Sequence, residues 1–183
     1  MRHVKRSALV ALPPGRLYAL INDIDSYPRF LPWCTAARVE SRTPTQIVAT
    51  VEVHRAGLAA EFTTRNELTP ERRVHMQLVK GPFRELEGEW LLTPLEMPAA
   101  AADDAQARRV ARDAGPAADA VSAGASGSAA GGVAGTRIEL SLRFAFANRL
   151  KALVFEPLFE ETASQLVDAF VARARELAGG GRG

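Results

Sequence analysis

The chain has 183 residues, a formal net charge of +2 and a single cysteine, Cys34. This length suits one domain, the small charge gives no indication of DNA binding, and one cysteine excludes an internal disulfide and suits a reducing compartment. No apolar run approaches the roughly 20 residues that a membrane-spanning helix needs, so we expect a cytoplasmic protein.

The first segments predict a strand followed by two short helices. Apolar and polar residues alternate over residues 2–12, which is the pattern of a half-buried strand. Pro13 and Pro14 then begin a helix, because proline suits the first helical turn. Asp25 and Ser26 are expected to cap a second helical segment over residues 27–31.

Six further strands are predicted from the alternation of apolar and polar residues, with glycine or proline marking most of the turns between them. Their ranges are 35–42, 46–54, 58–68, 73–79, 83–95 and 136–146. The alternation is regular, so one face of each strand is packed against the core and the other is exposed to solvent, which is typical of an antiparallel sheet.

A low-complexity segment separates the last two predicted strands. Residues 96–135 contain sixteen alanines, six glycines and no aromatic residue. Such a composition cannot bury enough apolar surface to form a packed core. We therefore expect a flexible insertion within a single domain that spans residues 1–183.

The last apolar stretch, residues 148–178, predicts a long helix with Asn148 as its N-cap. Pro157 is expected to kink or break it near Phe155 and Glu156. Apolar residues recur at helical intervals and form the expected buried stripe. These residues are Leu150, Leu153, Val154, Leu158, Leu166, Ala169, Phe170, Ala174 and Leu177. A one-faced antiparallel sheet and this helix predict a two-layer α+β domain, with an apolar cavity wherever the sheet curls away from the helix.

The histidines and the cysteine do not form a recognisable reactive site. His3, His54 and His75 are too dispersed for a metal-ligand spacing, and each falls on the polar face of a predicted strand. Cys34 has no histidine near it in the sequence, so we expect a small buried thiol rather than a nucleophile.

Three acidic residues, Glu85, Glu87 and Glu89, share one face of a predicted strand. Paired carboxylates could serve acid–base chemistry, but at two-residue spacing on a solvated face we expect an exposed stripe with arginine and lysine partners. No nucleophile, base and oxyanion donor come together in the sequence. We therefore predict that the protein is not an enzyme and holds no metal or cofactor.

Residues 27–34 (YPRFLPWC) hold three aromatic residues, two prolines and the cysteine. One interpretation is structural, a plug that closes one end of the core. The other is functional, with rigid prolines holding aromatic side chains at the mouth of a cavity through which a ligand passes. The two interpretations are compatible, and the sequence leaves both open.

Four segments together carry a family resemblance. They are SYPRFLPWC (26–34), FTTRN (62–66), KGPFRELEGEW (80–90) and FEPLFEETASQLVDAF (155–170). In this order they resemble the coenzyme Q-binding START-like family, which includes RatA ribosome-association toxins and mitochondrial coenzyme Q chaperones and is often labelled oligoketide cyclase/dehydrase. The resemblance covers the chain outside residues 96–135. It implies a helix-grip (START/Bet v 1-like) fold, in which a curved antiparallel sheet wraps around the long C-terminal helix.

The resemblance also implies a function. Our first expectation is a non-enzymatic protein that binds ubiquinone or a similar lipid in an apolar cavity and supports respiration. The alternative is a RatA-type toxin that binds the large ribosomal subunit and blocks subunit association. A polyketide cyclase or dehydratase is less favoured, and transient contact with a membrane stays open. Basic residues available for the ribosome are Arg2, Lys5, Arg6, Arg38 and Arg42.

The predicted ligand-binding residues come from the aromatic segment, the apolar strand faces and the helix stripe. They are Tyr27, Phe30, Trp33, Phe62, Met76, Leu78, Trp90, Phe144, Leu158 and Leu166.

Overall fold

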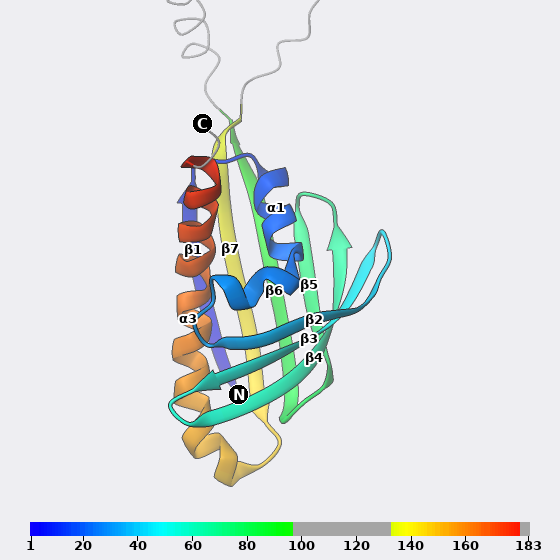
Figure 1. The fold of residues 1–183 in the computed structure, drawn as a ribbon, viewed down its shortest axis with the longest axis vertical. Helices are drawn as coiled ribbons and strands as arrows, with labels where there is room; N and C mark the ends of the chain where they lie inside the picture. The colour runs from blue at the N-terminus through cyan, green and yellow to red at the C-terminus, as the bar shows by residue number, and fades with distance from the viewer. Residues whose placement is uncertain (97–132, 180–183) are drawn as a thin grey trace, which may run out of the picture.

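In the computed structural model, which describes residues 1–96 and 133–179, a seven-stranded antiparallel sheet curls around a long C-terminal helix (Figure 1). The strands are β1 (Arg2–Val10), β2 (Cys34–Arg42), β3 (Gln46–Arg55), β4 (Leu58–Thr69), β5 (Arg73–Lys80), β6 (Phe83–Glu96) and β7 (Val133–Phe146). The helices are α1 (Pro14–Asn22), the 3-10 helix η1 (Ile24–Arg29) and α3 (Arg149–Gly179). The predicted α+β helix-grip fold is confirmed.

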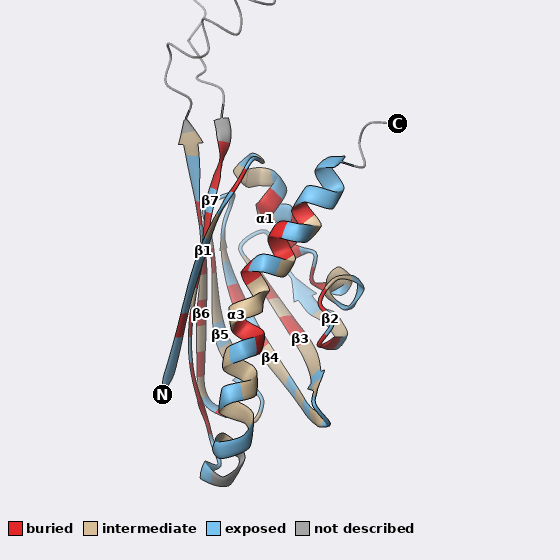
Figure 2. Cartoon of the chain, turned by 90° about the vertical axis from the view of Figure 1, so that its left-hand side faces the viewer, coloured by how far each residue is buried: buried red, intermediate tan, exposed pale blue. Residues whose placement is uncertain are grey.

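The order of strands explains how the sheet encloses a helix. It is β1-β7-β6-β5-β4-β3-β2, so β1 and β2 are consecutive in the chain but lie at opposite edges. The helices α1 and η1 carry the chain from one edge to the other (Figure 1). Figure 2 shows α3 between the part of the sheet that contains β1 and β7 and the part that contains β2 and β3. The concave face of the sheet therefore faces α3 from two sides.

One aromatic cluster, the Phe170 cluster, fixes the C-terminal half of α3. The Phe170 ring is almost fully buried and contacts the rings of Tyr27, Phe30 and Trp90 at centroid distances of 5.4, 5.2 and 5.2 Å. The contacts are edge-to-face, an arrangement that places the positive edge of one ring against the negative face of another. The helix is thereby joined to η1 on one side and to β6 on the other.

A second aromatic cluster, the Phe159 cluster, fixes the N-terminal half of α3. The Phe159 ring contacts Phe144 at 4.7 Å, Phe83 at 5.0 Å, Phe62 at 6.0 Å and Phe146 at 6.2 Å between centroids. These partners come from β4, β6 and β7. Phe159 and Phe170 are eleven residues apart, or about 16 Å along the helix axis, so α3 is held at two separate places.

The predicted stripe of α3 was wrong at both ends of the helix. Leu153 and Val154 are 77% and 57% exposed, and Leu177 is exposed as well. Of the predicted stripe, Phe170 and Ala174 are buried, and the helix also buries Ala163, Val167 and Val171. Apolar residues occur on more than one side of this helix, so several stripes can be drawn from the sequence. The aromatic partners on the sheet decide which side is buried.

Two local predictions about the helices do not hold as made. Helix α3 continues through Pro157, so the break expected near Phe155 and Glu156 does not occur, while a kink there stays a prediction. Asp25 does not cap a helix over residues 27–31. It lies inside η1, which begins at Ile24, and its carboxylate accepts a hydrogen bond of 3.1 Å from the backbone N–H of Val39.

The predicted insertion is shorter than the sequence suggested. Glu96 belongs to β6 and pairs with Val133 in β7. Gly135 lies in β7 against the first strand, where an added Cβ would be 2.6 Å from the carbonyl oxygen of Val10. Gly135 looks like part of a linker by composition. It is in fact required to be small, because the backbone of Val10 approaches it closely. Residues 97–132 lie outside the described residues, so their flexibility and the single domain over 1–183 stay predictions.

We expect residues 97–132 to be dispensable. Because Glu96 and Val133 are paired neighbours, a short Gly/Ser turn can replace the segment without stretching the hairpin. The melting temperature of this variant, measured by circular dichroism, should stay within a few degrees of the full chain. As a contrast, Gly135→Ala should lower it by several degrees, because the added methyl meets the Val10 backbone. A large loss of stability in the replacement variant would contradict the prediction.

Candidate ligand-binding cavity

An apolar cavity lies between α3 and the concave face of the sheet, bounded at its ends by Phe159 and Phe170. Between these two rings the helix lines the cavity with Thr162, Ala163 and Leu166. The cavity has a volume of about 110 Å³. An apolar cavity of about 150 Å³ accommodates benzene, and drug-sized ligands usually occupy about 300 Å³ or more. This hollow therefore has room for part of a ligand, such as one ring.

The cavity wall carries no charged side chain. Among the described residues that line it, none is an aspartate, glutamate, histidine, lysine or arginine. Its polar members are Tyr27, Cys34, Thr64, Asn66 and Thr162. Catalysis by proton transfer needs a group that changes its charge near the working pH, so the two that ionise, Tyr27 and Cys34, decide what chemistry is available.

Tyr27 presents a neutral phenol. Its hydroxyl donates a hydrogen bond of 2.5 Å to the carbonyl oxygen of Ile21, which ties η1 to α1. Burial raises the pKa of Tyr27 well above its ordinary range, and the negative charges of Cys34 and Asp23 would raise it further. Deprotonation of the phenol at neutral pH is therefore disfavoured.

Cys34 is the buried thiol that the sequence predicted. Its Sγ donates a weak hydrogen bond of 3.4 Å to the carbonyl oxygen of Ala36. Burial, with a smaller contribution from the negative charge of Glu52, raises the pKa of the Cys34 thiol to about 11. The reactive form of cysteine is the thiolate, so this residue is not poised as a nucleophile.

Six of the ten predicted ligand-binding residues line the cavity. They are Tyr27, Trp33, Phe62, Met76, Trp90 and Leu166. The other four lie outside it. Phe30 packs on Phe170, with the guanidinium carbon of Arg173 6.0 Å from its ring centroid. Leu78 and Phe144 pack in the Phe159 cluster, and Leu158 borders a separate hollow of about 30 Å³. Ligand binding by any of the ten stays a prediction.

The aromatic segment over residues 27–34 packs as a closure of the cavity. Leu31, Trp33 and Cys34 are buried. Tyr27, Leu31, Trp33 and Cys34 all form part of the wall. This packing agrees with the structural interpretation, while passage of a ligand through this segment stays a prediction.

Sequence reasoning missed most of the wall residues, among them two rings of α3 and two polar residues of β4. Phe159 and Phe170 close the two ends, and Thr64 and Asn66 line the cavity from β4. The signal for the last two was present, because they follow Phe62 at intervals of two and must share its face. The inward face of β4 is predicted from its apolar residues alone, and this rule misses polar side chains that point inward.

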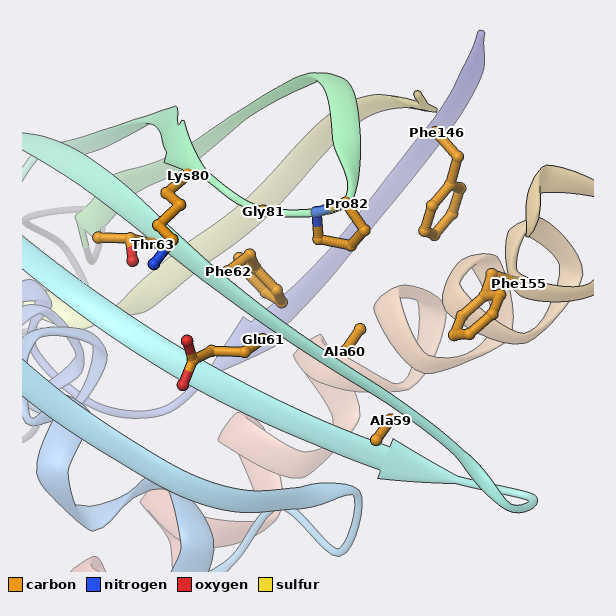
Figure 3. A pocket seen from close by; sticks show the side chains of 10 residues that line it. All are labelled: Ala59, Ala60, Glu61, Phe62, Thr63, Lys80, Gly81, Pro82, Phe146 and Phe155. Atoms are coloured by element: carbon orange, nitrogen blue, oxygen red, sulfur yellow. The ribbon is translucent and has the colours of Figure 1, made fainter. Parts of the chain in front are cut away.

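A surface cleft of about 330 Å³ lies beside the cavity (Figure 3). It is bordered by β4, by the β5–β6 turn at Lys80, Gly81 and Pro82, and by Phe155 of α3. Phe62 belongs to the walls of both the cleft and the cavity. The small hollow beside Leu158 shares Phe155 with the cleft and Phe159 with the cavity. The three spaces therefore adjoin one another along the N-terminal half of α3.

Residues 10–171 match the family described as "Polyketide cyclase / dehydrase and lipid transport". The chain belongs to this family. The "Ribosome association toxin RatA" of Escherichia coli is 37% identical over 177 residues, a match that covers 97% of this chain and 89% of that protein. The START-like resemblance drawn from the sequence is thereby confirmed.

Solved structures with low sequence identity to this chain show the same fold. A START superfamily protein from Mycobacterium smegmatis has a TM-score of 0.65 at 17% identity, over 96% of this chain and 98% of that one. The Zhui aromatase/cyclase from a Streptomyces species has a TM-score of 0.67 at 16% identity, over 95% and 93%. At such low identity the likeness concerns the fold alone.

The convex face of the sheet carries the predicted stripe of paired charges. Glu87 accepts a hydrogen bond from Arg143 and lies 2.9 Å from Nε2 of His75, and Glu89 pairs with Arg73. The His75 contact and then the Arg143 hydrogen bond hold the pKa of Glu87 below its ordinary value. Within residues 1–96 and 133–179, no group of histidine, cysteine and acidic side chains could hold a metal ion.

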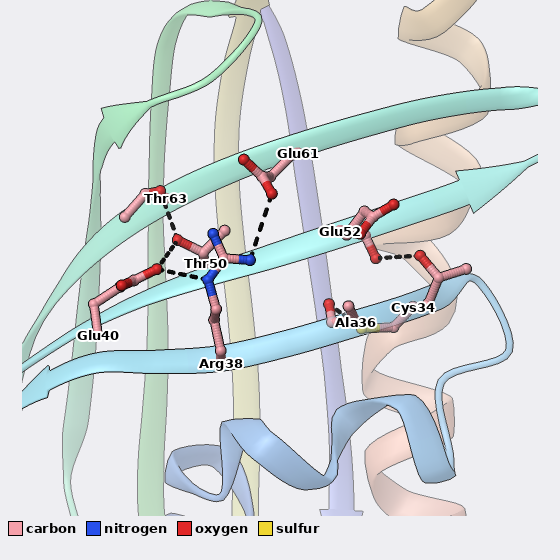
Figure 4. A network of polar contacts seen from close by, with 9 residues as sticks. Cys34, Ala36, Arg38, Glu40, Thr50, Glu52, Glu61 and Thr63 are labelled. Carbon is pink, nitrogen blue, oxygen red and sulfur yellow. Dashed lines mark hydrogen bonds and ion pairs between the residues drawn. The ribbon is translucent and has the colours of Figure 1, made fainter.

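A second polar network covers the outer side of β2, β3 and β4 (Figure 4). The Thr50 hydroxyl donates to Glu40 at 2.9 Å and lies 2.8 Å from the hydroxyl of Thr63. Arg38 donates to Glu40 at 2.8 Å and to Glu61 at 3.5 Å. The hydrogen bonds from Thr50 and then Arg38 lower the pKa of Glu40. These groups bond to one another and leave the cavity side of the strands apolar.

The basic residues proposed for ribosome contact do not form one cluster. Arg2, Lys5 and Arg6 lie on β1 and Arg38 and Arg42 on β2, the two opposite edges of the sheet, with α3 between them (Figure 2). Arg2 also pairs with Glu156, and Arg42 donates to the carbonyl oxygen of Asn22. Of this set, Lys5 and Arg6 are exposed neighbours on β1, and their side chains point to opposite faces of the sheet.

No helix in the described part of the chain is long and apolar enough to cross a membrane.

We expect the thiol of Cys34 to react slowly in the folded protein. At pH 8 its raised pKa leaves far less thiolate than an ordinary cysteine would have, so reaction with an aromatic disulfide reagent should be roughly a hundredfold or more slower than in denaturing urea. Absorbance of the released thiolate measures both rates, and Cys34→Ser is the blank because the chain has no second cysteine. Equal rates in the two states would contradict the prediction.

Proposed function

We propose that this protein binds an apolar ligand of the quinone class, such as ubiquinone, in the cavity under α3 and supports respiration without catalysing a reaction. The observation that carries the proposal is an internal apolar cavity whose described wall has no charged side chain. Such a wall suits a neutral ring and a hydrocarbon tail, since burial of an ionised group there would be costly. The family description, which includes lipid transport, supports the same class of ligand.

The dimensions suggest how such a ligand would lie. A cavity of about 110 Å³ suits one ring better than a whole lipid. The hollow beside Leu158 and the cleft bordered by Phe155 then offer a path for the tail along α3, with Phe62, Phe146 and Phe155 on one part of the cleft wall and Glu61 and Lys80 on another (Figure 3). In this arrangement the ring lies between the two aromatic clusters and the tail leaves between α3 and β4.

Two features favour binding over catalysis. The ionisable groups on the wall, Tyr27 and Cys34, both have raised pKa values and stay protonated at neutral pH. A cyclase or dehydratase acting in this cavity would need a general base, and the described wall offers none. The likeness to an aromatase/cyclase concerns the fold, and folds of this kind host different functions.

Contact with a membrane surface would give the ligand a route in and out. Leu153 and Val154 are exposed on α3 close in sequence to Phe155, which borders the cleft. Apolar side chains at such a position can enter the interfacial layer of a bilayer. We place the protein in the cytoplasm and its membrane contact as transient, at the N-terminal end of α3.

Ribosome association is the second candidate, and sequence identity favours it. The E. coli relative named as a ribosome association toxin matches nearly the whole chain. A surface for the large ribosomal subunit would have to use the convex face or the edge strand β1, where Lys5 and Arg6 are exposed. The cavity lies on the concave side, so the two functions do not compete for the same residues.

The variant Leu166→Trp should separate a ligand cavity from a solid core. Leu166 lines the cavity, so the larger ring should fill space meant for ligand. The protein should keep its melting temperature within a few degrees and lose at least tenfold in affinity for a short-chain ubiquinone, measured by quenching of tryptophan fluorescence. In a fully packed layer the same change would cost about 1–3 kcal/mol of stability.

Leu153→Trp is the matched control, because it places the same ring on the exposed side of the same helix. It should leave quinone binding and melting temperature unchanged. Wild-type protein that binds no quinone, together with a markedly destabilised Leu166→Trp, would rule out the ligand proposal.

Salt dependence should distinguish the two functions. Contacts between basic side chains and ribosomal phosphates release counterions, so co-sedimentation with large subunits should fall steeply as salt is raised. Quinone binding in a neutral cavity should hardly change. Reversing Lys5 and Arg6 to glutamate should weaken sedimentation, while the same reversal at the exposed Arg65 on β4 serves as the control. Strong, salt-sensitive sedimentation without any quinone binding would favour the ribosomal function alone.

A further inference from the structure

A polar pair on β4 interrupts the apolar wall of the cavity. Thr64 and Asn66 both line it, and both are buried, Asn66 with only 5% of its surface exposed. The Thr64 hydroxyl donates a hydrogen bond of 2.9 Å to Oδ1 of Asn66. The amide oxygen accepts this hydrogen, so it is the oxygen side of the amide that faces Thr64. The other side of the amide is the NH2 group, which can only donate.

The NH2 group of Asn66 has no hydrogen-bond partner among residues 1–96 and 133–179. The hydroxyl and thiol groups on the same wall are used differently. Tyr27, Cys34 and Thr162 each donate to a main-chain carbonyl oxygen, and Thr64 donates to Asn66. The Asn66 amide thus retains hydrogens that protein oxygens do not satisfy, and it borders the cavity instead of being sealed in the core, where Oδ1 of Asn22 is the fully buried unpaired atom of the described residues.

The two cross-strand neighbours of Asn66 offer no oxygen acceptor. It pairs in register with Ile47 on β3 and with Met76 on β5, whose side chains are apolar. A donor without an acceptor is costly in a protein interior, and most such groups in folded proteins are paired with protein or water. Asn66 lines the cavity, so a molecule inside the cavity, water or ligand, is placed to accept its hydrogen.

We propose that Asn66 recognises the ligand by donating a hydrogen bond from Nδ2 to a carbonyl oxygen on the ligand ring. The inference rests on the proposed function and names the ligand more narrowly, as a ring that carries a carbonyl group, such as a quinone or an aromatic ketone. A pure hydrocarbon of the same shape would fill the cavity but leave the amide unpaired. Thr64 is a positioning residue, because its hydroxyl fixes which side of the amide faces the ligand.

Two matched probes test the inference. A benzoquinone with a decyl tail carries ring carbonyls, and decylbenzene has the same tail on a ring without oxygen. Trp33 and Trp90 are the two tryptophans of the chain and both line the cavity, so quinone binding is read directly from fluorescence quenching. Decylbenzene is measured by its competition with the quinone. Wild-type protein should bind the quinone at least tenfold more tightly than decylbenzene.

Asn66→Leu removes the donor and keeps a side chain of similar size. It should weaken quinone binding about tenfold, the effect of one hydrogen bond in a buried site, and leave decylbenzene unchanged. Met76→Leu, a volume-conserving change at the paired position, is the control and should affect both probes alike. Infrared spectra give an independent readout, because the carbonyl stretch of bound quinone should be lowered in wild type and return in Asn66→Leu to its value in hydrocarbon solvent.

Each result bears on the inference. Equal weakening of both probes by Asn66→Leu, or no weakening of either, would overturn the role of Asn66 while the proposed function stands. Wild-type protein that binds neither probe would overturn the proposed function and the inference together. If Asn66→Leu does not fold, Asn66→Ala gives the same comparison, and an unshifted carbonyl stretch in wild type alone is enough to reject the hydrogen bond.

Discussion

The contact of α3 with the sheet at two aromatic clusters is the interaction on which the rest of the structure depends. Phe170 holds one half of the helix against Tyr27, Phe30 and Trp90, and Phe159 holds the other half. The large rings set the spacing between helix and sheet. Thr162, Ala163 and Leu166 lie between the rings and line the space that is left. The cavity is therefore produced by the same packing that stabilises the fold.

The separation of polar groups between the two faces of the sheet determines what the cavity can do. Charges on the convex face bond to one another, as in the contacts of Glu87 with His75 and Arg143. The concave face holds neutral groups whose hydrogens are mostly donated to the main chain. Under the proposed function, such an interior would discriminate ligands by shape and by one or two hydrogen bonds.

The sequence was sufficient to predict the strands, their antiparallel pairing and the helix-grip architecture, because alternation along a strand is a local property. The buried side of α3 was not predicted correctly. Leu153 and Val154 looked like stripe residues, and only the positions of the aromatic partners on β4, β6 and β7 show that Phe155 and Phe159 take that place. Which side of a helix is buried depends on contacts far apart in the chain.

The candidate site was predicted in part for a related reason. Four of the six predicted residues that line the cavity, Phe62, Met76, Trp90 and Leu166, lie on apolar strand faces or on α3, and periodicity finds such residues. The other two, Tyr27 and Trp33, belong to the aromatic segment. Asn66 was missed because a polar residue in a strand normally indicates the solvent-exposed face of the sheet. Its inward position follows from its spacing to Phe62, so spacing was the better guide and residue type the poorer one.

The place where β6 ends and β7 begins has a practical consequence. Glu96 and Val133 are adjacent, and the tip of this hairpin points away from the end of the molecule where α3 starts (Figure 1). The cleft at Phe155 and the β5–β6 turn lies toward that other end. A reporter domain or affinity tag inserted at the tip would therefore project from the far pole of the protein. The hairpin offers an attachment point for immobilisation or imaging that keeps the cleft accessible.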